Sequence, residues 1–136
     1  MPPRFVPRLL SGVLLVLAVL LTGCSHTGTT STAAPVASTP AWAGHMATVE
    51  ESRLPAEARQ TLRLVDRGGP FPYTQDGTVF RNFEGRLPSH PRGYYHEYTV
   101  RTPGSRDRGA RRIVTGQNGE VYYTDDHYDS FRAVLR

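Results

Sequence analysis

A carboxylate, a cluster of guanidiniums and an imidazole follow one another in the C-terminal half of the chain. Glu97 comes first, four arginines follow within 106–112, and His127 comes last, in the tripeptide Asp-His-Tyr. A carboxylate can take the proton of a ribose 2′-hydroxyl, and an imidazolium can return one to a departing 5′-oxygen. Arginines between them can hold the charge that builds on phosphoryl oxygens. These are the parts needed to cleave an RNA phosphodiester, and none of them requires a metal.

Short strands must position these side chains. Runs rich in β-branched and aromatic residues, separated by turn signals, predict strands at 94–101, 111–115, 121–124 and 131–135, with a shorter run at 78–80. The Asn118-Gly119 pair is a strong hairpin signal. Successive strands joined by tight loops favour an antiparallel meander.

One helix is predicted before the strands. Pro55 and Glu57 suit its first turn, apolar residues recur at 58, 62 and 65, and the pair Gly68-Gly69 ends it. The expected fold class is α+β, with this N-terminal helix packed on an antiparallel sheet of four to five strands. The second face of the sheet is then free to carry polar chemistry.

Strand alternation predicts which side chains share the polar face. Within residues 94–101 it places Tyr95, Glu97 and Thr99 on one side. Arg112 lies in the next strand and can project toward Glu97 if the register is right. We expect Arg108 in the loop before that strand and His127 in the loop after the fourth strand.

The N-terminus is typical of an export signal. Arg4 and Arg8 precede an apolar run at 9–21 that is short for a membrane span. The run ends at Cys24, the sole cysteine, in a context that resembles the lipobox of bacterial lipoproteins. That resemblance implies signal cleavage before Cys24, acyl chains on its sulfur and anchoring at the outer face of a membrane. Ordinary cleavage further on, for example after 33–34, would instead remove the cysteine.

Three segments are predicted: a signal peptide with lipobox at 1–23, a flexible Ser/Thr/Ala/Pro-rich tether at 24–49, and one folded domain at 50–136. The chain has sixteen arginines and no lysine, and losing Arg4 and Arg8 lowers its formal charge from +4 to +2. This balance is weak evidence for a nucleic-acid partner, and a solvated basic loop is the plain alternative for the arginine cluster. The remaining histidines lack partners at metal-ligand spacing, so no metal site is expected.

Four motifs together carry a family resemblance: GPFPYTQDG at 69–77, YYHEYTV at 94–100, RGARRIVTG at 108–116 and YYTDDHY at 122–128. They closely resemble the Sa-type guanyl-specific secreted ribonucleases, relatives of barnase and of the small fungal guanyl ribonucleases. The match runs from about residue 54 to 131 and therefore covers nearly the whole predicted domain. Its motifs are long and lie in the family order, which makes the resemblance specific.

The resemblance implies a reaction and a role for each matching residue. The family cleaves single-stranded RNA 3′ of guanosine through a 2′,3′-cyclic phosphate, which it hydrolyses to a 3′-phosphate, with no metal or cofactor. Glu97 then corresponds to the general base and His127 to the general acid. Arg108 and Arg112 correspond to phosphate-binding arginines, and Tyr128 to a hydroxyl that contacts the phosphate.

Guanine selection in this family belongs to the segment matching residues 80–84. Glu84 is implied to accept two N–H groups of guanine, the backbone of Arg81, Asn82 and Phe83 to donate to O6 and N7, and Phe80 to stack on the base. Two positions depart from the family pattern, since Arg81 replaces a polar amide and Phe83 an arginine. The family disulfide is missing as well, which puts stability in question more than activity.

The leading hypothesis is a monomeric, membrane-tethered extracellular endoribonuclease that acts on single-stranded RNA. A barstar-like inhibitor protein is a further partner that the resemblance implies, because an acidic surface would mimic phosphate at the arginine cluster. The alternative is a catalytically silent lipoprotein that uses the same fold to bind RNA or protein. A toxin-like ribonuclease delivered to competing cells is a third interpretation.

Overall fold

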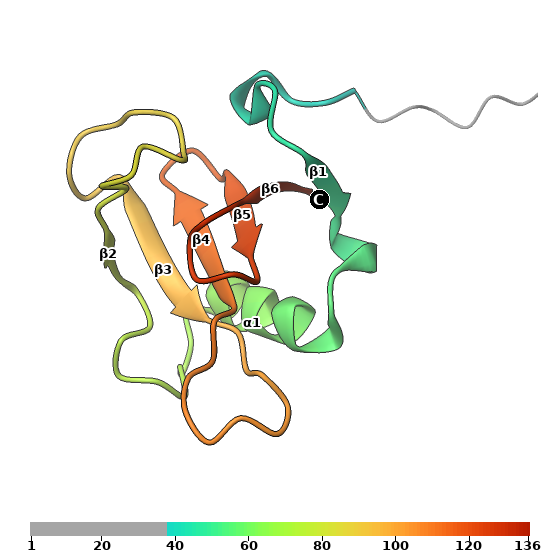
Figure 1. Ribbon diagram of the computed structural model, residues 1–136, viewed down its shortest axis with the longest axis vertical. Helices are drawn as coiled ribbons and strands as arrows, with labels where there is room; N and C mark the ends of the chain where they lie inside the picture. The colour runs from blue at the N-terminus through green and yellow to red at the C-terminus, as the bar shows by residue number, and fades with distance from the viewer. Residues whose placement is uncertain (1–37) are drawn as a thin grey trace, which may run out of the picture. The chain divides into compact units, whose positions relative to one another are not determined.

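The computed structural model describes residues 38–136, in which a six-stranded sheet carries the α-helix on one face (Figure 1). The signal peptide and Cys24 predicted from the sequence lie outside the described residues. Among residues 38–136, no helix is long and apolar enough to cross a membrane. In chain order the elements are η1 (Ala41–Ala43), β1 (Thr48–Glu50), η2 (Glu51–Arg53), α1 (Ala56–Arg67), β2 (Thr78–Phe80), β3 (Tyr95–Thr99), β4 (Arg112–Gly116), β5 (Val121–Thr124) and β6 (Arg132–Leu135).

Helix α1 begins and ends where the sequence predicts. Pro55 precedes its first turn, which carries Glu57 where a negative charge favours the helix dipole. Gly68 adopts a left-handed conformation with φ of 75°, and the N–H of Gly69 donates to the carbonyl of Leu64 at 2.9 Å. This C-terminal cap satisfies carbonyls that the helix leaves unpaired.

The sheet has the order β1-β6-β5-β4-β3-β2. Strands β2 to β6 pair antiparallel, whereas β1 pairs parallel with β6, so that Thr48 lies opposite Ala133. The α+β fold with one helix on the sheet is confirmed. The expected strand count of four to five and the purely antiparallel sheet are wrong, because β1 adds a sixth strand that pairs parallel with β6 at the edge of the sheet.

Apolar clusters cover both faces of the sheet. The cluster under α1 joins helix residues to alternate residues of the strands, namely Leu54, Ala58, Leu62, Val100, Ile113, Val121, Tyr123 and Val134. On the other face, a second cluster gathers Leu87, Tyr94, Tyr95, Val114, Tyr122 and Phe131. That face was expected to be free for polar chemistry. Part of this face is instead covered by the second cluster, so only the remainder of the face can carry polar side chains.

The tether expected at 24–49 is corrected for the residues that the structure describes. Residues 41–43 form η1, residues 48–50 form β1, and the expected domain boundary at residue 50 falls at the end of a paired strand. Trp42 lies edge-to-face on Tyr122 with ring centroids 5.4 Å apart. Met46 packs on the same cluster. The folded unit therefore begins before residue 50.

The last residue of the chain ties three elements together. The Arg136 guanidinium donates to Glu51 of η2 at 2.7 Å and to both carboxylate oxygens of Asp66 of α1, at 2.9 and 2.6 Å. The pKa of Asp66 is lowered by the hydrogen bond from Arg136. In the absence of a disulfide within the domain, this fork holds β6 to the helix.

We expect Trp42→Ala to lower the free energy of unfolding by about 2 kcal/mol, less than a fully buried tryptophan costs, because Trp42 is half-buried. Urea unfolding of the full chain, followed by circular dichroism, measures this. Since Trp42 is the sole tryptophan, its fluorescence should also shift to the red on unfolding. The exposed neighbour variant His45→Ala is the control and should change stability by less than about 0.5 kcal/mol. If Trp42→Ala leaves the free energy of unfolding unchanged, the segment around Trp42 does not contribute to the folded unit, as expected of a flexible tether.

Candidate functional site

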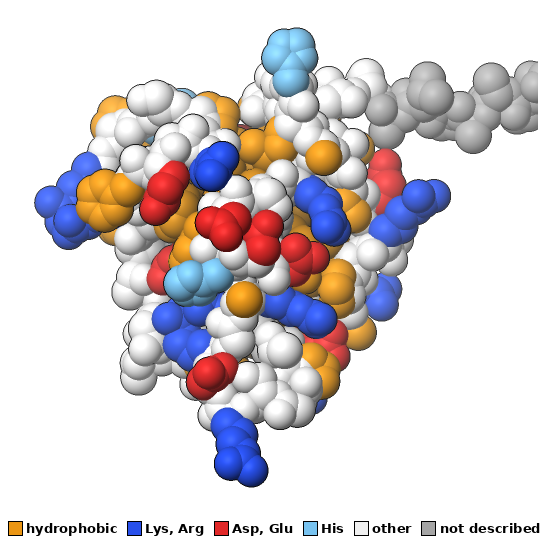
Figure 2. All heavy atoms as spheres, in the orientation of Figure 1, with side chains coloured by type: hydrophobic (Ala, Val, Ile, Leu, Met, Phe, Trp, Pro, Cys, Tyr) orange, Lys and Arg blue, Asp and Glu red, His pale blue; other side chains and the backbone are white. Residues whose placement is uncertain are grey.

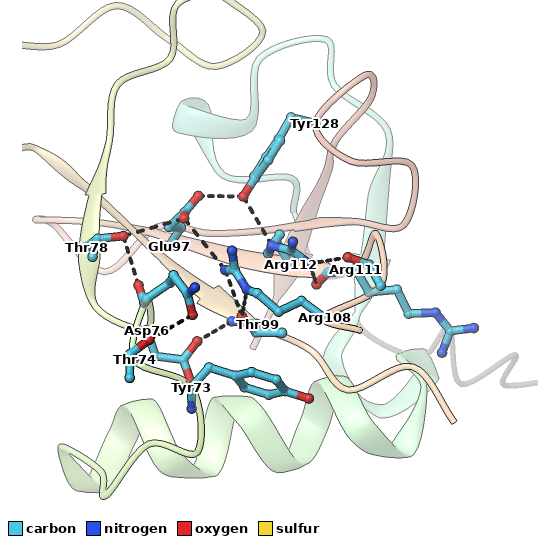
Figure 3. A network of polar contacts seen from close by, with 12 residues as sticks. Tyr73, Thr74, Asp76, Thr78, Glu97, Thr99, Arg108, Arg111, Arg112 and Tyr128 are labelled. Atoms are coloured by element: carbon cyan, nitrogen blue, oxygen red, sulfur yellow. Dashed lines mark hydrogen bonds and ion pairs between the residues drawn. The ribbon is translucent and has the colours of Figure 1, made fainter. Parts of the chain in front are cut away.

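The site is built on the middle of β3. Glu97 pairs in register with Thr78 of β2 and with Val114 of β4, and its side chain is 16% exposed. Its two carboxylate oxygens have different neighbours: Oε2 accepts a hydrogen bond from the Tyr128 hydroxyl at 2.5 Å, whereas Oε1 lies 3.9 Å from Nη2 of Arg108 and 3.5 Å from Oγ1 of Thr78 (Figure 3). The carboxylate is thus held by a hydroxyl on one side and faces a cation on the other.

Register brings Arg112 to the same face. Thr99, Arg112 and Thr124 are paired across β3, β4 and β5, two residues along from Glu97. Arg112 is only 2% exposed, so its charge must be satisfied inside the protein. Its Nε donates to the Tyr128 hydroxyl at 3.1 Å, and Nη1 donates to the carbonyls of Gly109 and Arg111, both at 2.8 Å.

Arg108 reaches the site from the loop between β3 and β4. Its Nε and Nη2 both donate to Oγ1 of Thr99, at 3.1 and 2.9 Å. Its side chain is 28% exposed, which leaves part of the guanidinium facing solvent beside Glu97 (Figure 3). The two arginines therefore differ: Arg112 is buried and fixed by carbonyls, whereas Arg108 is fixed by one threonine and lies at the surface.

A strained loop carries His127 and Tyr128. Both have positive φ angles, 57° and 76°, which cost energy in residues other than glycine. Asp126 holds the loop by accepting hydrogen bonds from Thr124 Oγ1, Ser130 N and Ser130 Oγ, at 2.8, 2.9 and 2.5 Å. The His127 N–H donates to the carbonyl of Ala110 at 3.1 Å. The imidazole is exposed next to the Tyr128 ring, with centroids 4.9 Å apart.

Tyr128 connects the loop to the sheet. Its hydroxyl donates to Glu97 and accepts from Arg112, and its ring stacks on Phe80 with centroids 5.2 Å apart. Burial, and then the hydrogen bond to Glu97, raise the pKa of Tyr128 to about 12. The phenol therefore keeps its proton at neutral pH and remains a hydrogen-bond donor.

The segment 80–84 follows β2 and borders the carboxylate. A cavity of about 310 Å³ lies between this segment and the side chains of Glu97 and Tyr128. Asn82 has a positive φ of 52°, and its side-chain amide closes the loop through two hydrogen bonds with the backbone of Leu87, at 2.8 and 3.0 Å. Glu84 lines the cavity, and its side chain is exposed.

Most of the site residues expected from the sequence come together. The described residues join Glu97, Tyr128 and Arg112 by hydrogen bonds and Arg108 to Glu97 by an ion pair, with Phe80 stacked on Tyr128. His127 lies beside the group, and within residues 38–136 its ring makes no hydrogen bond. Arg81 and Phe83 border the same cavity but are exposed, and the guanidinium lies 5.7 Å from the centroid of the Phe83 ring.

Two further residues hold the site. Thr99 fixes Arg108, and alternation along β3 had already placed Thr99 beside Glu97, so that signal was present but unused. Asp126 caps the loop that carries His127 by accepting hydrogen bonds from Ser130. Asp76 accepts the N–H groups of Tyr73 and Thr99 and so ties the turn before β2 to β3. Residues 38–136 contain no cluster of three or more side chains suited to bind a metal.

A family model described as ribonuclease matches residues 36–135 of the chain. That range is more than half of the sequence, so the chain belongs to the ribonuclease family.

Relatives within this family narrow the comparison. Guanyl-specific ribonuclease Sa3 of Kitasatospora aureofaciens is 68% identical over 84 residues, which cover 61% of this chain and 60% of that protein. Guanyl-specific ribonuclease St of Saccharopolyspora erythraea is 60% identical over 82 residues, covering 60% of this chain and 81% of that one. The chain thus spans less than two thirds of the first relative's length. The predicted resemblance to Sa-type guanyl-specific ribonucleases is confirmed.

Solved structures agree with these relatives. The crystal structure of ribonuclease Sa2 with guanosine-2′-cyclophosphate is similar, with a TM-score of 0.64 and 51% identity over 66% of this chain and 96% of that one. A further ribonuclease Sa2 structure, from a study of complexes with mononucleotides, has a TM-score of 0.66 and 52% identity over 67% and 95% of the two chains.

We expect Asp126→Asn to destabilise the protein in a pH-dependent way. The hydrogen bonds from Ser130, first from its side chain and then from its backbone, lower the pKa of Asp126 from 3.8 to about 2. A carboxyl with a depressed pKa in the folded state contributes stability above its unfolded pKa and loses it as the pH falls through the folded value. The stability difference between parent and variant should therefore be largest above pH 4 and shrink toward pH 2.

Urea unfolding of both proteins at a series of pH values measures this difference. Asp129→Asn removes an exposed carboxyl of the same loop and is the matched control. A difference that stays constant from pH 6 to pH 2 would contradict the role of Asp126.

Proposed function

We propose that the protein is a metal-independent endoribonuclease that cleaves single-stranded RNA on the 3′ side of guanosine. The observation that carries this proposal is the group at the cavity edge, where Glu97 and Tyr128 border the segment 80–84 and two arginines lie directly behind. The names of the relatives, guanyl-specific ribonucleases, support the same reaction.

In the first step Glu97 takes the proton of the guanosine 2′-hydroxyl, and the oxygen attacks the adjacent phosphorus. The bond from phosphorus to the 5′-oxygen of the next nucleotide breaks, and His127 gives that oxygen a proton. A 2′,3′-cyclic phosphate forms and the downstream RNA leaves. In the second step the roles are exchanged. His127 takes a proton from water, and the water oxygen attacks the phosphorus of the cyclic phosphate. The bond from phosphorus to the 2′-oxygen breaks, Glu97 returns a proton to that oxygen, and a 3′-phosphate remains.

Charge stabilisation in this mechanism belongs to Arg108, Arg112 and Tyr128. Arg112 is immobilised by two carbonyls, so its position is set before substrate arrives, and fixed donors of this kind cost no reorganisation during the reaction. Arg108 is partly exposed and can receive a phosphoryl oxygen from the solvent side. The Tyr128 hydroxyl, which donates to Glu97 in the free protein, can turn its proton to the phosphate when substrate occupies the carboxylate.

Guanine selection is proposed for the segment 80–84. The carboxylate of Glu84 can accept both N1–H and N2–H of guanine, a pair that adenine does not offer. The backbone of Arg81, Asn82 and Phe83 would donate to O6 and N7, and Phe80 would provide the stacking surface. The Asn82 side chain is engaged with Leu87 and thereby shapes the segment. Because the two departures from the family pattern change exposed side chains, the backbone contacts are retained.

We also propose export of the chain, with Cys24 lipidated and the enzyme held at the outer face of a membrane as a monomer. The support is the sequence pattern of residues 1–24, which lie outside the described residues. A barstar-like inhibitor is proposed as a partner, since acidic side chains on its surface would complement Arg108 and the cationic loop around it.

We expect the full chain to cleave GpU in the presence of EDTA, and ApU and CpU far more slowly. A Glu97→Gln, His127→Ala double variant should lose at least about 10³-fold in kcat/KM, because it lacks both proton-transfer groups. Quantification of the cyclic phosphate product measures the reaction.

The matched control is Glu50→Gln, His45→Ala, which removes the same two side-chain types from exposed positions on β1 and the preceding turn. It should cleave GpU at the parental rate. A folded parent that cleaves none of the three dinucleotides would overturn the ribonuclease proposal and favour the catalytically silent binding module.

A further inference from the structure

A second cavity lies on the other side of the segment that borders the base site. It has a volume of about 380 Å³, and residues Phe80, Arg81, Asn82 and Phe83 line both this cavity and the one beside Glu97. The second cavity is completed by residues 89–92 and Tyr95, whereas Glu84, Glu97 and Tyr128 line only the first. Four consecutive residues therefore form a wall with an open site on each side.

The side chains around the second cavity suit a nucleotide. Its charged lining consists of Arg81 and Arg92, with His90 alongside, and no carboxylate lines it. His90 stacks flat on Tyr94, with centroids 3.7 Å apart and planes 7° apart, and lies edge-to-face on Tyr95. Phe83 is 80% exposed at the rim. At the edge of the molecule where the loop after β2 lies, Figure 2 shows a hydrophobic side chain beside a basic one. Exposed aromatic rings between cations are the usual surface for single-stranded nucleic acid.

The position of this cavity along β3 indicates which nucleotide it would take. Tyr95 lies at one end of the strand, Glu97 at its middle, and Thr99, which binds Arg108 and pairs with Arg112, at the other end. The loop after β2 and the loop between β3 and β4 accordingly lie at opposite ends of the sheet (Figure 1). Each two-residue step along a strand is about 7 Å, so Tyr95, Glu97 and Thr99 are spread over about 14 Å of this face. With the guanosine 3′-phosphate at the arginines and the base in the cavity beside Glu97, the end of the strand at Tyr95 is left for the 5′ side of the substrate.

We propose that the cavity between residues 80–83 and 89–92 is a subsite for the nucleotide on the 5′ side of the cleaved guanosine. The phosphate that joins the two nucleotides lies against Arg92 and Arg81, and the upstream base stacks on the exposed rings of His90 and Phe83. The subsite deepens the proposed ribonuclease function, on which it rests. It also accounts for exposed side chains that the cleavage of a dinucleotide leaves unused.

The test compares substrates that differ only on the 5′ side of guanosine. We expect the full chain to cleave ApGpU with a kcat/KM about tenfold higher than GpU, since one stacked base and one phosphate are added. pGpU, which adds the phosphate alone, should show part of this gain. His90→Ala, Arg92→Gln should reduce the ratio between ApGpU and GpU to about 1 while GpU is cleaved at the parental rate. Arg63→Gln, an exposed change on α1, should keep the full ratio.

A parental ratio near 1, or a tenfold ratio that the double variant retains, would overturn the subsite. Failure of the underlying function is distinguished by GpU itself, which would then not be cleaved by the parent. In that case binding of the analogues ApdGpU and dGpU, which lack the attacking 2′-hydroxyl, is measured by calorimetry. Tighter binding of the longer analogue that is lost in the double variant supports the subsite without catalysis, and equal binding of the two overturns it.

Discussion

The site depends on a guanidinium that is buried. Arg112 is 2% exposed, and leaving such a charge without partners would cost several kcal/mol, so the surrounding chain must fold to satisfy it. Its partners come from two loops: the loop before β4 provides two carbonyls, and the loop after β5 provides the hydroxyl of Tyr128. Because Tyr128 also donates to Glu97, the buried cation fixes the loop that carries His127 as well as the carboxylate. The strained backbone of His127 and Tyr128 is tolerated because this network and the cap on Asp126 define it from two sides.

The parts of this arrangement that follow from strand alternation could be predicted from the sequence. Glu97 and Thr99 share a face because they are two residues apart in a strand, and the Asn118-Gly119 turn sets the pairing of β4 with β5. Helix α1 was likewise predictable from its apolar stripe and its glycine cap. Strand alternation does not predict the conformation of the loops. Asn82 closes its loop through Leu87, and no periodic pattern marks such a pair. Strand β1 was missed for a related reason: three residues are too few to show a period, and the strand exists because the C-terminal strand offers it an open edge.

Without a disulfide in the described domain, stability comes mainly from packing on the two faces of the sheet, and the partly exposed fork at Arg136 adds little to it. The second cluster also supports the site. Trp42 packs on Tyr122, Tyr122 packs on Phe131, and Phe131 packs on Phe80. Phe80 in turn stacks on Tyr128. An apolar path therefore runs from the segment first taken as a tether to the ring that borders the base cavity. The N-terminal residues belong to the folded unit because they complete the packing behind that ring.

The two departures from the family pattern are best understood together with this path. Arg81 and Phe83 alternate with residues whose positions are fixed, Phe80 by stacking and Asn82 by hydrogen bonds. A substitution at Arg81 or Phe83 therefore alters the outer surface of the segment without moving its backbone. The guanidinium and the ring lie against each other, 5.7 Å apart, at the border of both cavities. If guanine is recognised through the backbone and Glu84, these side chains are free of that task. In the proposed subsite, their cationic and aromatic character would add affinity for RNA beyond the guanosine, at the end of the sheet opposite the arginines proposed to hold the reacting phosphate.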